Sequence, residues 1–124
     1  MGSKMEKLKV KPQSQPRWER EEQVLLVVEY FSCKDDNHLM AKSCLFLSEF
    51  LRVRAKKLGK DISPNYRNLY GIEKQMQNLA HCNPQTESKA NGHESAWMYK
   101  IVNEYLADPQ KILYEAYEII KKYR

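Results

Sequence analysis

Apolar residues recur along the chain with the period of about 3.6 residues that is typical of an amphipathic helix. The pattern appears in five stretches, at about residues 19–32, 38–58, 69–80, 94–106 and 109 to the end. No stretch shows the strict alternation of apolar and polar residues that is typical of a half-buried strand. The pattern therefore predicts an all-α fold, a single small domain of about five helices.

The first two predicted helices are the most apolar. From Val24 to Val28 the first is apolar nearly all round, so we expect it to be central and buried. The second has one apolar stripe, widened by further apolar residues, and a helix this broadly apolar is expected to be packed on two sides. The stripe consists of Met40, Cys44, Leu47, Leu51 and Leu58, and the widening residues are Leu39, Phe46, Phe50 and Val53.

The third predicted helix has an apolar face and a polar face. Ile72, Met76 and Leu79 form the apolar stripe, and Asn68 is expected to cap the helix. The opposite face carries Tyr70, Lys74, Gln77 and His81, with Glu73 as its one carboxylate. Such a face suits contacts with phosphates and base edges. An ordinary solvated helix surface has the same composition and is the alternative interpretation. Gly71 within this helix indicates close approach of another backbone.

Positive charge is concentrated in one part of the chain. The protein has 124 residues, the size of one domain, and a net charge of +5. Between residues 52 and 67 six basic residues oppose one acidic residue, which gives a local charge of +5. The six are Arg52, Arg54, Lys56, Lys57, Lys60 and Arg67. Cations at the end of a helix also stabilise that helix, so the cluster has a structural interpretation as well.

Other features limit the classes of function. Residues 1–16 are polar and basic without periodicity, so we expect a flexible basic arm followed by a helical domain at 17–124. Three scattered cysteines without a Cys-x-x-Cys pair predict a reducing, cytoplasmic location and no zinc site. Membrane-spanning segments, nucleotide-binding loops and hydrolase motifs are absent. The sequence thus predicts a protein that is not an enzyme, uses no cofactor and has no membrane partner.

The order of the elements indicates binding to duplex DNA. A basic helix end, a loop of about ten residues and a short helix with a polar outer face resemble a helix-turn-helix, formed here by helices 38–58 and 69–80. We expect phosphate contacts from Arg52, Lys56, Lys57, Lys60 and Arg67, and base contacts from Tyr70, Lys74, Gln77 and His81. The competing function is a protein-interaction module, such as a phage- or host-encoded regulator, because Tyr, Trp and Met are enriched in interfaces.

Two segments also carry a family resemblance. The matching residues are Arg67, Asn68, Gly71, Ile72, Met76, Asn78, Leu79 and Pro84, together with Trp18, Glu22, Tyr30, Ser88, Lys89 and Trp97. They resemble the N-terminal helical domain of bacterial HNH-type restriction endonucleases. Leu69, Gln75 and Asn83 depart from that pattern, and no His-Asn-His nuclease motif follows. The resemblance implies a DNA-recognition module without its nuclease, with a nuclease or another protein as a further partner.

Overall fold

The computed structural model describes residues 16–86 and 94–124. These residues form five α-helices and no strand, which confirms the predicted all-α fold. The helices are α2 (Arg20–Cys33), α3 (Asn37–Lys57), α4 (Leu69–Cys82), α5 (Ala96–Ala107) and α6 (Pro109–Tyr123). Their ends agree with the sequence prediction to within about two residues. Apart from Pro16, the predicted arm lies outside the described residues.

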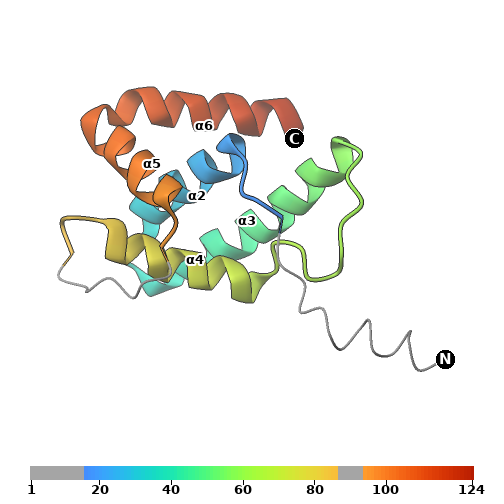
Figure 1. Cartoon of the computed structure of the whole chain (residues 1–124), viewed down its shortest axis with the longest axis horizontal. Helices are drawn as coiled ribbons and strands as arrows, with labels where there is room; N and C mark the ends of the chain where they lie inside the picture. The colour runs from blue at the N-terminus through green and yellow to red at the C-terminus, as the bar shows by residue number, and fades with distance from the viewer. Residues whose placement is uncertain (1–15, 87–93) are drawn as a thin grey trace.

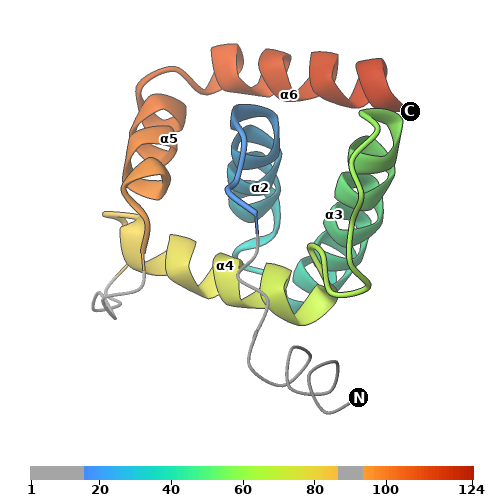
Figure 2. The same ribbon diagram turned by 45° about the vertical axis from the view of Figure 1, so that its right-hand side comes forward.

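Helix α2 passes through a frame made by the other four helices. Figure 2 shows α6 and α4 on two opposite sides of the frame and α3 and α5 on the other two, with α2 between them. Helix α2 contacts each of the four, and the view in Figure 1 agrees. Val24, Leu25, Leu26 and Val27 are at most 1 % exposed. The prediction of a central, buried first helix is therefore confirmed.

The helices begin and end at residues suited to those positions. The Asp36 carboxylate accepts hydrogen bonds from the backbone N–H groups of His38 and Leu39, at the start of α3. The Asn68 side chain accepts one from the backbone of Gly71 at 2.8 Å, as its predicted role as N-cap requires. Gly59 ends α3 with φ of 77°, a left-handed conformation that glycine adopts without steric cost.

The glycine inside α4 has a local explanation. A Cβ atom added to Gly71 would lie 3.1 Å from Oδ1 of Asn68, the capping side chain of the same helix. The residue therefore leaves room for its own N-cap. The sequence indicated close approach of another backbone at Gly71, but the neighbour of the added Cβ is this capping side chain.

Helix α3 is covered on only part of its apolar surface. Its inner residues Cys44, Leu47 and Leu51 are fully buried against the core. The outer apolar residues stay between 36 % and 51 % exposed: Leu39, Leu45, Phe46 and Val53. Helix α3 does pack against α2, α4 and α6, but within the described residues no helix covers these outer side chains.

Candidate nucleic-acid interface

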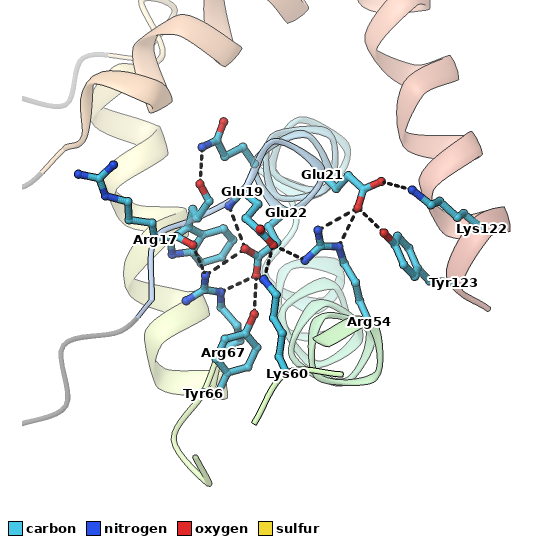
Figure 3. Close-up of polar contacts among 12 residues, drawn as sticks. Arg17, Glu19, Glu21, Glu22, Arg54, Lys60, Tyr66, Arg67, Lys122 and Tyr123 are labelled. Carbon is cyan, nitrogen blue, oxygen red and sulfur yellow. Dashed lines mark hydrogen bonds and ion pairs between the residues drawn. The ribbon is translucent and has the colours of Figure 1, made fainter. Parts of the chain in front are cut away.

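The predicted phosphate contact Arg67 lies inside the protein. Its guanidinium group binds the carboxylate of Glu22 on α2, with Nε 2.7 Å from Oε2 and Nη2 3.0 Å from Oε1 (Figure 3). Arg67 is 3 % exposed and Glu22 is 0 % exposed. The hydroxyl of Tyr66 donates a further hydrogen bond to Glu22 Oε2 at 3.0 Å. A buried charge needs a partner and hydrogen bonds of this kind, so the pair fixes the approach to α4 against α2.

Aromatic rings enclose the same guanidinium group. The Arg67 Cζ atom lies 4.4 Å from the ring centroid of Trp18 and 4.6 Å from that of Tyr66. Trp18 in turn stacks on Trp97 of α5, with centroids 5.8 Å apart. Burial, with the Glu22 charge adding to it, raises the pKa of Tyr66 to about 12. The placement of Arg67 on the DNA-facing surface is corrected accordingly: its burial leaves it no surface to offer to a phosphate.

Two more of the basic residues bind the first turn of α2. Arg54 is 4 % exposed and lies 3.0 Å from Glu19 and 2.9 Å from Glu21. Lys60 binds Glu19 at 2.5 Å, and this hydrogen bond holds the pKa of Glu19 below its ordinary value. The three glutamates at the start of α2, Glu19, Glu21 and Glu22, thus form an acidic turn that neutralises much of the basic run.

The other three basic residues, Arg52, Lys56 and Lys57, bind no carboxylate among the described residues. The Arg52 guanidinium, half-buried, donates to backbone carbonyls of the following loop, including that of Tyr66 at 2.7 Å. Lys57 donates to the carbonyl of Tyr123 at 2.6 Å, where α3 and α6 end side by side (Figure 1). Lys56 is exposed and makes no ion pair with any residue that the structure describes. The six basic residues therefore do not form one positively charged surface.

The outer face of α4 is exposed as predicted at Tyr70, Lys74 and Gln77, whereas the fourth predicted residue, His81, is partly buried. Ile72, Met76 and Leu79 are at most 3 % exposed and pack on the core. Tyr70 is 67 % exposed, and Lys74 and Gln77 are also exposed. The Lys74 ammonium lies 5.7 Å from the Tyr70 ring centroid. His81 is half-buried, and its Nδ1 atom has no hydrogen-bond partner among the described residues.

Three of these residues border a cleft of about 560 Å³ between α4 and the junction of α2 with α3. Tyr70, Lys74 and Gln77 contribute from α4. The cleft also contacts the buried side chains of Cys44 and Met76, while Lys34 and Asp35 add an ion pair to its lining. The cleft places an ammonium, an amide and a phenol around an apolar base, an arrangement suited to binding a flat polar group.

Cys44 is the thiol that lines the cleft. Burial raises the pKa of the Cys44 thiol to about 11, which keeps it protonated and a poor nucleophile at neutral pH. Over residues 16–86 and 94–124 no three His, Cys, Asp or Glu side chains are placed to hold a metal ion. No helix in that part of the chain is long and apolar enough to cross a membrane.

The structure divides the nine predicted residues into three groups. Arg67 and Lys60 bind the acidic turn of α2, whereas Arg52, Lys56 and Lys57 lie at the end of α3. The third group is the α4 face: Tyr70, Lys74, Gln77 and His81. The prediction missed the partners of these cations, which are Glu19, Glu21 and Glu22. The sequence did contain a signal for them, because three carboxylates in one helical turn can neutralise three cations.

No family model, curated protein or solved structure matches this chain.

Proposed function

We propose that this protein is a non-catalytic DNA-recognition module in which the outer face of α4 contacts bases. The observation that carries the proposal is the exposure of Tyr70, Lys74 and Gln77 on a helix whose other face is fixed in the core. Lys can pair with guanine O6 and N7, and Gln with adenine N6 and N7, at the edges presented in the major groove. A helix anchored along its buried side holds such groups in a defined orientation.

We assign the phosphate contacts to basic residues that form no ion pair with Glu19, Glu21 or Glu22. These are Lys56 and Lys57 at the end of α3, supported by Arg52. Helix α3 has 21 residues and is about 31 Å long, so its basic end and the α4 face can meet separate parts of a duplex. In this helix-turn-helix-like arrangement the phosphate contacts position the protein and the α4 contacts select sequence.

The ion pairs lower the expected salt dependence. If Arg52, Lys56 and Lys57 each neutralise one phosphate, affinity should fall roughly 40-fold between 50 and 200 mM salt. Neutralisation of about five phosphates by the whole basic run would give a fall on the order of a thousandfold. The slope of affinity against salt therefore distinguishes the two contact sets.

The resemblance to the N-terminal domain of HNH-type restriction endonucleases supports the same function. Its residues come from two segments far apart in the sequence, and several of them meet in one network. Arg67 binds Glu22 and lies over Trp18, which stacks on Trp97. The residues that match the family pattern thus lie together in the fold, which is consistent with one structural unit. A nuclease is then an additional partner of this unit.

Filter binding on two unrelated duplexes tests the proposal. Lys57→Ala should weaken binding to both duplexes alike and reduce the salt slope by about 1. Gln77→Ala or Lys74→Ala should change the preference between duplexes by about 1–3 kcal/mol. Lys111→Ala is a matched control, because this exposed lysine lies in the first turn of α6, away from α4 (Figure 2). Wild-type binding by folded α4 variants on both duplexes contradicts the assignment of α4.

The second candidate function is a protein-interaction module. It is favoured by one observation, the exposed apolar residues on the outer side of α3. An apolar interface is insensitive to salt, whereas phosphate contacts weaken steeply. Absence of binding to any duplex at low salt would assign the chain to this second class.

A further inference from the structure

The exposed apolar residues of α3 form a stripe with a regular spacing. Leu39, Phe46 and Val53 are seven residues apart, so they lie on one face of the helix over about 21 Å. They are 45 %, 36 % and 45 % exposed. Figure 2 places α3 at the edge of the frame, with no labelled helix beyond it. Contiguous exposed apolar residues of this kind mark interaction sites.

Opposite charges lie beside the stripe, one on each side of its centre. Lys42 and Glu49 are exposed, and each is three residues beyond a stripe residue, Leu39 or Phe46, and so lies on the same side of α3. Neither forms an ion pair with any residue in the described ranges. The surface of α3 therefore carries an apolar centre with Lys42 and Glu49 placed almost symmetrically about Phe46, and a second cation unpaired within the described ranges, Lys56, lies three residues beyond Val53 on the same side.

We propose that a second copy of this chain binds the stripe, with the two α3 helices antiparallel and a two-fold axis passing close to Phe46. Such an axis brings residues at equal distances from position 46 opposite each other. Leu39 then packs against Val53 of the second copy, and Phe46 against its own equivalent. Lys42 and Glu49 fall within one residue of the same level and form two identical ion pairs across the axis.

The antiparallel direction follows from the charges. In a parallel pair Lys42 would lie beside Lys42 and Glu49 beside Glu49, and like charges placed together disfavour association. The centre of the antiparallel interface is also its most aromatic part. The ring of Phe46 lies 5.5 Å from that of Phe50, centroid to centroid, so four rings meet near the axis. Clustered aromatic residues at the middle of an interface supply much of its binding energy.

Charge reversal tests the ion pairs in the full-length chain. Sedimentation equilibrium should show a concentration-dependent dimer, and Lys42→Glu or Glu49→Lys should each raise its dissociation constant at least tenfold. The double variant Lys42→Glu with Glu49→Lys should restore the wild-type constant. A chain that stays monomeric up to millimolar concentration overturns the proposal, as does a double variant no tighter than the single ones. Circular dichroism checks that each variant is folded.

Cysteine cross-linking tests the position of the axis. Phe46→Cys should form a disulfide with its own equivalent, because only a residue near the axis meets itself. Leu39→Cys alone should not, yet mixed with Val53→Cys it should form a heterodimeric disulfide. The native thiols of Cys33, Cys44 and Cys82 are at most 5 % exposed, so they compete little. Self-linking of Leu39→Cys, or failure of the mixed pair to link, overturns the antiparallel arrangement.

Discussion

Removal of the Arg67 side chain tests the buried pair that joins α4 to α2. Arg67→Ala leaves the Glu22 carboxylate, which is 0 % exposed, without its ionic partner. Breaking a buried ion pair from one side typically destabilises a protein by about 3–5 kcal/mol, because the remaining charge is uncompensated. For a domain of this size that loss lowers the melting temperature by roughly 10–20 °C. It is a large fraction of the about 5–15 kcal/mol that stabilises an ordinary domain.

Two further variants separate the causes. Arg67 has φ of 46°, which costs a non-glycine residue about 1 kcal/mol or more. Arg67→Gly loses the same ion pair but not the backbone cost, so it should be less destabilised than Arg67→Ala by about 1 kcal/mol. The double variant Glu22→Gln with Arg67→Gln should lose less stability than the sum of the two single changes, by up to about 3 kcal/mol.

The assay is urea unfolding followed by far-ultraviolet circular dichroism at neutral pH. The free energy of unfolding of each variant is compared with that of the wild type. A loss below about 1 kcal/mol for Arg67→Ala, or strict additivity of the two Gln substitutions, would refute the reasoning. Such a result would mean that the Glu22 carboxylate finds other solvation in the native state, and that the buried pair contributes little to stability.

Four further predictions concern stability. Acid should destabilise the fold below about pH 4.5, the ordinary pKa of Glu, because the pKa values of Glu19 and Glu21 are lowered in the folded state. The hydrogen bond from Lys60 lowers the pKa of Glu19. Burial raises the pKa of Glu21, but hydrogen bonds from Tyr123, Arg54 and Lys122 outweigh this effect. Circular dichroism against pH checks this, and an unchanged melting temperature down to pH 3 speaks against it. Alkali should destabilise from about pH 10 towards 12, since folded Tyr66 keeps its proton to about 12, and Tyr66→Phe should flatten the pH dependence of the melting temperature in that window. Met76→Ala, at a position 3 % exposed, should cost about 2–5 kcal/mol in urea unfolding, and a cost below 1 kcal/mol contradicts its core position. Asn68→Ala should cost about 1 kcal/mol through loss of the α4 cap, and a neutral result in the same assay contradicts the capping role.

The helices could be predicted because the forces that define them act between near neighbours. The apolar spacing of Ile72, Met76 and Leu79 fixes which side of α4 is buried, and Asn68 caps a backbone group three residues away. The exposed face of α4 followed from the same period, so Tyr70 and Lys74 were placed correctly on it. The exposure of the outer side of α3 could not be predicted, because an apolar pattern indicates a packing surface but does not identify the molecule that covers it.

The basic run was misjudged for a physical reason. A local charge sums neighbours in the sequence, whereas ion pairs depend on distances in the fold. Arg54 meets Glu21 across 33 residues, and Arg67 meets Glu22 across 45. These partners become visible only when α2 is known to lie between α3 and the start of α4. Hydrophobic periodicity predicted that α2 is central, but not which of its ends faces the cations.

The central position of α2 has a consequence for synthesis of the protein in the cell. Arg20 binds Glu104 and Glu115, 84 and 95 residues later, and Tyr123 donates to Glu21 across 102 residues. The apolar surface of α2 therefore cannot be fully covered until α6 has been translated. At about 5–20 residues per second, this helix waits on the order of 5–20 s for its last neighbour. During that time the nascent chain presents a helix that is apolar nearly all round from Val24 to Val28, and molecular chaperones that bind such segments are expected to engage it first.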